Sequence, residues 1–334
     1  MGEATKKFVF YGTLAALSVF WAEVVSTNVT WAAAHPAFYL AYGLLVVLFI
    51  DTLMRYQVRE YWYWYLYGAL VGLITETYVA KVTFYGAGGD THRVLGIAPA
   101  PILFILLFYH AFLSFMVPAY TAKRILGMPL PIRTRKLYDL VFLATPFFLV
   151  IFNGMGLKAD PLSLIPGVFI STGILIAWFL TLNKMGDIKD VLLSKKTYKR
   201  LLWFTIIAYI IFLLTTTNRK AHNHAPTDFP ILPMIGVSLV IFGILYLIHK
   251  TVGKGRTPVT ELSYSPKNID WKLMAGWLAF YLVAGLASLP LIWILRSVAM
   301  FIWVPIWLAA VAVAAVSFPA SLIALMTRLI REKD

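Results

Sequence analysis

The chain has 334 residues, of which 60% are hydrophobic and only 13% carry a formal charge. A water-soluble domain of this size could not bury so much apolar surface, so we expect a membrane protein. The net charge of +14 would indicate nucleic acid in a soluble protein. Here we attribute it to the Lys and Arg that collect on the cytoplasmic side of membrane proteins, and we expect no nucleic-acid partner. The chain contains no cysteine, which excludes disulfides, thiolate metal sites and thiol nucleophiles.

Apolar stretches of membrane-crossing length recur along the whole chain. Each is close to the roughly 20 residues that an α-helix needs to cross about 30 Å of hydrocarbon. Backbone amides in lipid must bond within their own segment, so these stretches are helices. The sequence predicts an all-α, polytopic transmembrane helix bundle of about ten helices. We expect one domain over 1–334 without a separate soluble part. The expected spans are 8–25, 36–54, 61–80, 96–120, 138–157, 163–182, 201–217, 231–248, 273–295 and 300–325.

Lys and Arg residues collect in every second segment between these spans, which would place them on one side of the membrane. With the N-terminus inside, 23 of the 29 Lys and Arg residues fall in inner segments and 6 in outer ones. This bias predicts that both termini are cytoplasmic in a multi-pass protein of the cell membrane. The basic segments 127–139 and 195–200 also favour contact with anionic lipids at the cytoplasmic face.

Two ionisable residues within the expected spans are the candidate catalytic residues. Glu76 lies about 6 Å below the outer end of its span by the helical rise. Lys81 is five residues further on and points in another direction, so we expect a partner for Glu76 on another helix or a water-filled pocket. His110 lies near the middle of the next span, where an imidazole can tie two helices together or take part in proton transfer.

Histidines and carboxylates also gather in the expected outer loops. The segment 218–229 contains His222, His224 and Asp228, which are ligand types for zinc and similar divalent metals. The alternative is that these side chains form the mouth of a cavity that contains Glu76. In the inner loop 183–193, acidic residues alternate with apolar ones, and we expect an amphipathic loop helix there.

The stretch 74–126 resembles the integral-membrane carotenoid hydratases and, more distantly, the small membrane lycopene cyclases. The resemblance consists of a glutamate in a membrane helix, a glycine-rich aromatic loop, a helix start of Gly-x-x-Pro type and a basic end. It implies that Glu76 protonates a double bond of an isoprenoid, and that Tyr85 and Gly86 match the aromatic-glycine pair of the loop. His110 falls where those families tend to have tryptophan, so the chemistry need not be identical.

The residues themselves suit such chemistry, because a carboxyl in a dry pocket tends to be neutral and aromatic faces stabilise cations. The same rings also suit helix packing. We take the following as candidate substrate-binding residues: Tyr78, Lys81, Tyr85 and Tyr109.

Three functions remain open from the sequence. The first is an enzyme that acts on a membrane lipid or isoprenoid by acid–base chemistry in a cavity near the outer face. The second is a secondary transporter or proton-coupled carrier that uses Glu76 and His110 as proton-linked groups. The third is a non-catalytic subunit of a membrane complex, with another membrane protein or a second copy of the chain as partner.

Overall fold

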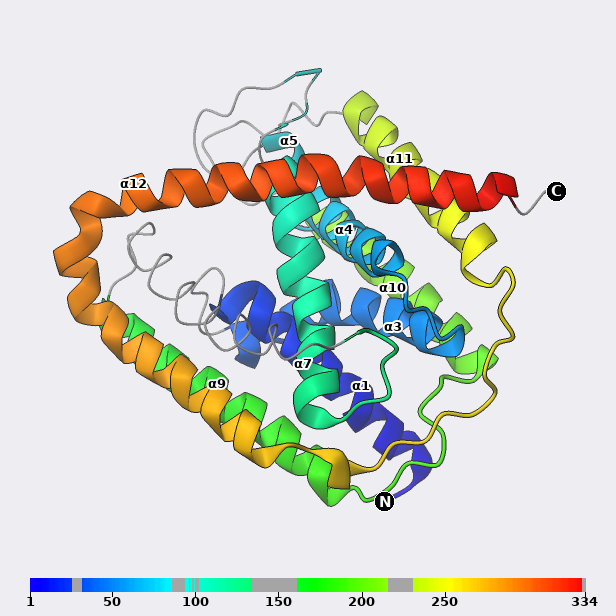
Figure 1. The fold of residues 1–334 in the computed structure, drawn as a ribbon, viewed down its shortest axis with the longest axis horizontal. Helices are drawn as coiled ribbons and strands as arrows, with labels where there is room; N and C mark the ends of the chain where they lie inside the picture. Colours follow the sequence, from blue (N-terminus) through cyan, green and yellow to red (C-terminus); the bar gives the residue numbers. More distant parts are fainter. Residues whose placement is uncertain are drawn as a thin grey trace.

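The computed structural model describes residues 1–25, 32–85, 94–95, 97, 99, 102–133, 161–215 and 231–331. Within these residues the regular elements are helices, and the chain is an all-α bundle (Figure 1). The longer elements are α1 (Glu3–Val19), η1 (Phe20–Val25), η3 (Tyr39–Gly43), α3 (Leu44–Arg55), α4 (Tyr61–Tyr78), η4 (Ile102–Met116), α7 (Val117–Leu126), α9 (Pro161–Lys184), α10 (Lys195–Thr215), α11 (Ile231–Val252) and α12 (Trp271–Arg331). The short elements are η2 (Ala32–Ala34), α2 (Pro36–Phe38), α5 (Val82–Tyr85) and η6 (Pro266–Asn268).

The polytopic helix bundle is confirmed, although the division into spans differs from the prediction. Seven helices of the described residues are long and apolar enough to cross a membrane. Helix α4 is not one of the seven, because Tyr and Trp crowd its first turns and lower its mean hydropathy. The expected spans 273–295 and 300–325 belong to one helix, α12. The expected span 138–157 lies outside the described residues.

Helix α12 is a single helix of 61 residues that changes direction along its length. Its first half lies beside α9, and its second half crosses the opposite end of the bundle (Figure 1). Three prolines, Pro290, Pro305 and Pro319, lie within the helix. A proline removes one backbone hydrogen bond and kinks the helix, which accounts for a bend inside continuous helical structure.

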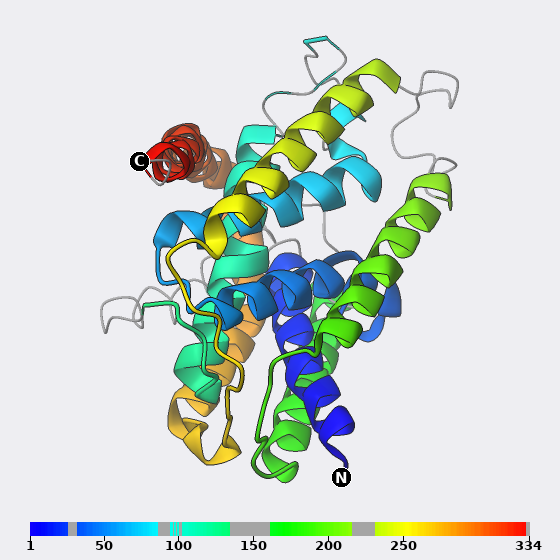
Figure 2. The same cartoon turned by 90° about the vertical axis from the view of Figure 1, so that its right-hand side faces the viewer.

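Helix α4 lies at the centre of the bundle and packs most extensively against η4. Every residue from Tyr63 to Thr77 is buried. Helices α10 and α11 lie along the outside, where many of their Leu, Ile, Phe and Trp side chains are exposed (Figure 2). In a bilayer these exposed apolar faces contact lipid rather than water.

The segments expected on the inner side of the membrane contact one another. Near the N-terminus, the Lys6 ammonium donates to the carbonyl of Asp187 at 2.6 Å, and Lys7 pairs with Asp190 at 3.0 Å. A β-bridge then joins Ile188 to Tyr264. The chain from 185 to 194 therefore contains no helix, and the expected amphipathic loop helix is wrong: its carboxylates bind the neighbouring segments instead of forming a helical face.

Both ends of the described chain belong to this same face, which we call the inner face. Glu60, directly before α4, binds the guanidinium groups of Arg256 and of Arg328 near the end of α12. The Arg328 side chain also donates to the carbonyl of Lys254 at 2.7 Å. This arrangement agrees with the charge alternation of the sequence, which places both termini on one side.

Candidate functional site

The candidate site is a hydrogen-bonded chain of three side chains between α4 and η4. Glu76 Oε1 lies 2.9 Å from Nε2 of His110, and Nδ1 of the same imidazole lies 2.7 Å from Oγ of Ser114. The exposed fraction is 5% for Glu76, 2% for His110 and 0% for Ser114. The partner of Glu76 is thus on another helix, as predicted, and Lys81 is not that partner. The chain places a carboxyl, an imidazole and a hydroxyl inside the helix bundle.

Two glycines of α4 allow this close approach of the two helices. A Cβ atom on Gly72 would lie 2.5 Å from the carbonyl oxygen of Leu106 and 2.7 Å from the His110 Cβ. A Cβ atom on Gly68 would lie 2.5 Å from the carbonyl oxygen of Ala111. Small residues four apart let membrane helices pack backbone against backbone. The spacing of Gly68 and Gly72 therefore brings α4 close enough for Glu76 to reach the imidazole.

Three π-helical segments meet around the chain and supply further members. His110 and Ser114 lie on η4, Tyr42 on η3 and Glu23 on η1. The Tyr42 ring stacks on the imidazole with 5.5 Å between centroids, and its hydroxyl donates to Glu23 Oε1 at 2.5 Å. Glu23 is only partly buried, so the polar cluster extends from the buried pair toward the outer end of α1. Single π turns in helices are frequent at functional sites.

The π segments also bond their backbone carbonyls to hydroxyl groups on neighbouring helices. The wider turn exposes carbonyl oxygens that an α-helix would keep within its own ladder. The accepting carbonyls and their donors are Ala22 with Tyr109, Ala41 with Tyr209, Leu107 with Tyr65 and Ser114 with Ser18. The site is thus held by side-chain hydrogen bonds on several sides, which fixes the imidazole between its partners.

Two protonation states of these three side chains, which differ by one proton, fit the hydrogen bonds. With an ionised Glu76, the carboxylate accepts from Nε2–H and the Ser114 hydroxyl donates to Nδ1, and the chain carries one negative charge. One further proton makes the chain neutral, either as a carboxylic acid that donates to Nε2 or as a carboxylate beside an imidazolium. The hydrogen-bond distances are compatible with either arrangement.

Aromatic side chains separate the pair from the inner face. Phe49 contacts Tyr67 at 4.6 Å and Phe115 at 6.4 Å between ring centroids, and Trp64 contacts Phe115 at 5.9 Å. These rings lie further toward the inner ends of their helices than Glu76 or His110. On the outer side, the polar cluster continues through Tyr42 to Glu23.

The three predicted substrate-binding residues whose side chains are described, Tyr78, Lys81 and Tyr109, bond to different segments of the chain. The Tyr78 hydroxyl lies 2.6 Å from Oγ of Ser238 on α11, and Lys81 donates to the carbonyl of Leu213 at 3.3 Å. Burial lowers the pKa of the Lys81 ammonium, which follows the last turn of α4. The Tyr109 hydroxyl donates to η1, and its ring packs edge-on against His110 with 5.2 Å between centroids. The backbone of Tyr85 ends α5, and its side chain lies outside the described set.

The predicted metal ligands His222, His224 and Asp228 lie outside the described residues, as does Gly86 of the resemblance. Among the residues that are described, no group of three His, Asp or Glu side chains could hold a metal ion. The divalent metal at the outer histidines therefore stays a prediction.

Sequence reasoning missed Ser114, Tyr42 and the two glycines. Two signals were available: Ser114 is four residues after His110 on the same helix, and Gly68 and Gly72 are four apart. The contact of Tyr42 with His110 depends on how three helices pack and has no local signal. Glu23 on η1 joins the site through the hydrogen bond that its carboxylate accepts from the Tyr42 hydroxyl.

The comparisons place the chain in a family without assigning it an activity. The model of an uncharacterized membrane protein family matches residues 13–331, so the chain belongs to that family. Neither the curated proteins nor the solved structures contain a match to the chain. Family membership and the apolar helices agree on a multi-pass membrane protein.

Proposed function

We propose that the protein is a membrane enzyme whose acid–base centre is the Glu76–His110 pair, acting on a lipid or isoprenoid from the outer half of the bilayer. The observation that carries the proposal is the buried chain Glu76–His110–Ser114, with 2.9 and 2.7 Å between its successive atoms. Ionisable side chains inside a membrane are costly and mark sites of function more often than sites of packing.

In this proposal Glu76 is the acid and His110 is the group that exchanges a proton with it across their hydrogen bond. In the neutral form of the chain the proton can lie on the carboxyl, and a neutral carboxylic acid is the form that protonates a double bond. The imidazole can take the proton back, because its other nitrogen is held by Ser114. When Glu76 donates its proton, the π electrons of the double bond form the new C–H bond and leave a carbocation on the neighbouring carbon. Water adds to this carbocation, and the proton that the added water loses returns to the pair.

The class of substrate follows from the position of the pair. A substrate that partitions into the bilayer suits a pair buried within a helix bundle whose α10 and α11 present apolar surface to the lipid. The resemblance of 74–126 to carotenoid hydratases favours an isoprenoid within that class. The polar cluster reaches toward Glu23 on the outer side, and this favours water or proton exchange from that side.

A comparison of membrane lipids tests the proposal without knowledge of the substrate. Total lipids from cells that express the wild type, Glu76→Gln or Glu3→Gln are compared by mass spectrometry. Gln retains a hydrogen bond to the imidazole but cannot donate an acidic proton, so we expect normal yield in detergent and loss of the lipid product. The exposed Glu3 is the charge-matched control and should behave as wild type. Identical lipid profiles for the wild type and Glu76→Gln would refute the proposed enzyme.

A proton-coupled carrier is the second candidate, because both members of the pair are occluded. An occluded proton site is what a carrier has between its two open states. The purified protein in liposomes distinguishes the two: a carrier moves protons across the membrane in a Glu76-dependent way and leaves the lipids chemically unchanged. If neither property depends on Glu76, the pair serves helix packing, as a non-catalytic subunit requires.

A further inference from the structure

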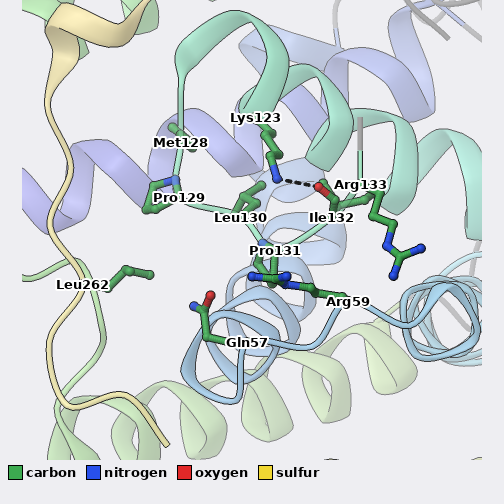
Figure 3. Close-up of a pocket in the computed structure, with 10 residues that line it drawn as sticks. All are labelled: Gln57, Arg59, Lys123, Met128, Pro129, Leu130, Pro131, Ile132, Arg133 and Leu262. Atoms are coloured by element: carbon green, nitrogen blue, oxygen red, sulfur yellow. Dashed lines mark hydrogen bonds between the residues drawn. The ribbon is translucent and has the colours of Figure 1, made fainter. Parts of the chain in front are cut away.

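The cavity on the inner face is lined by three cationic side chains. It has a volume of about 400 Å³ and lies between α7, the chain before α4 and the segment that follows α7 (Figure 3). Arg59, Lys123 and Arg133 contribute the positive charges. The rest of the lining is Gln57, Met128, Pro129, Leu130, Pro131, Ile132 and Leu262. The cavity therefore combines a basic part with an apolar wall.

The wall of the cavity is formed by a chain segment with little conformational freedom. Pro129 and Pro131 fix the backbone dihedral φ at two positions of this segment. Gly127 has φ +64°, and a Cβ atom there would lie 2.4 Å from Cβ of Asn268, so the turn that begins the segment requires glycine. The Lys123 ammonium donates to the carbonyl of Ile132 at 2.6 Å and joins the segment to α7, as Figure 3 shows. These restrictions and this hydrogen bond hold the wall of the cavity in one conformation.

The three cations have no carboxylate partner within the described residues. Nearby cations do have one: Arg124 pairs with Asp270 at 3.4 Å, and Glu60, next to Arg59, binds two guanidinium groups from other segments. Like charges that share one cavity repel each other unless an anion lies between them. Arg and Lys are the side chains that bind phosphate oxygens, Arg with two parallel hydrogen bonds. An anionic ligand in the cavity would therefore compensate these positive charges.

We propose that this cavity binds a phosphate group, and that its source is the headgroup of an anionic lipid of the inner leaflet. Lys123 lies in the last turns of α7 and Arg59 directly before α4, so the cations lie at the level of the lipid headgroups. The apolar wall of Met128, Leu130 and Leu262 suits the glycerol and the first carbons of an acyl chain. A soluble phosphate compound offers the same chemistry and is the alternative source.

The test uses the full-length protein in detergent and two charge-matched double variants. In the pocket variant, Arg59→Gln and Arg133→Gln, both side chains are exposed, so folding does not depend on them. The control, Lys184→Gln and Lys189→Gln, removes two exposed charges from the end of α9 and the segment that follows it, neither of which lines the cavity. Native mass spectrometry measures binding of phosphatidylglycerol, phosphatidylcholine and inorganic phosphate to each protein.

We expect the wild type and the control to bind phosphatidylglycerol more tightly than phosphatidylcholine, and the pocket variant to lose about tenfold in that affinity. Binding of inorganic phosphate alone, lost in the pocket variant, would support the phosphate site and refute a lipid source. An equal loss in the pocket variant and the control would show general surface attraction and overturn the proposal, as would unchanged binding of every probe in the pocket variant.

Discussion

Substitution of Gly72 by alanine should separate α4 from η4 and disrupt the Glu76–His110 hydrogen bond. The new Cβ atom would lie 2.5 Å from the Leu106 carbonyl oxygen, whereas ordinary contact begins at 3.4 Å. Relief requires a movement of about 0.9 Å between two helix backbones, since the contacted atom cannot rotate away. A movement of that size along the 2.9 Å hydrogen bond would extend it to about 3.8 Å, beyond hydrogen-bonding distance.

The expected loss of stability is about 1–3 kcal/mol for the overpacked contact, with a further contribution from the weakened pair. Thermal unfolding in detergent, followed by circular dichroism, measures the loss as a lower Tm. The control is Gly243→Ala on α11, where a Cβ atom would meet no atom within 4 Å. That change should leave Tm unchanged or raise it slightly, because alanine favours helix. If Gly72→Ala is as stable as Gly243→Ala, the close packing of the two helices is not as described.

Three further predictions concern charged groups. Although burial opposes it, the backbone amide and the two guanidinium groups beside Glu60 hold its pKa below the usual glutamate value. Its ion pairs should therefore stabilise the protein above pH 4.5 and lose this effect as the pH falls below that value. When Tm is measured over a pH series, the decrease in Tm that comes from Glu60 should be absent in Glu60→Gln. Asp51→Asn should cost about 3–5 kcal/mol, because Arg55 loses its buried partner, with faster proteolysis at 185–194 as a second measure. His110→Ala should destabilise the protein by a similar amount, because the Glu76 carboxyl loses its imidazole partner. Adding Glu76→Gln to this variant should recover part of the lost free energy of unfolding, measured by chemical unfolding. No recovery would show that the two residues are not coupled.

The all-α bundle and the common side of its inner segments could be predicted because both depend on composition. Lipid requires helices, and the charge bias determines orientation whatever the details of packing. The number of spans was harder to predict. The charged residue Arg296 lies between two apolar stretches and indicates a boundary between two spans, but the backbone continues there as one helix. The loop helix expected at 183–193 fails for a similar reason: Asp190 accepts from the backbone amides of Leu192 and Leu262, which long-range folding brings together.

The candidate site was only partly predictable. Glu76 and His110 could be identified because ionisable residues are rare inside apolar spans, and a partner on another helix follows from the helical geometry. The identity of that partner depends on Gly72, which sets the distance between the helices. The stacking of Tyr42 depends on the π turns of η3 and η4, and the sequence contains no pattern that indicates such turns.

The ion pairs of Glu60 have a consequence for biosynthesis. This carboxylate is translated 268 residues before its partner Arg328. The contact between the start of α4 and the end of α12 can therefore form only after α12 has been translated. A chain truncated before Arg328 would retain the earlier helices and still leave this junction open, which offers quality-control proteases a marker of incomplete copies.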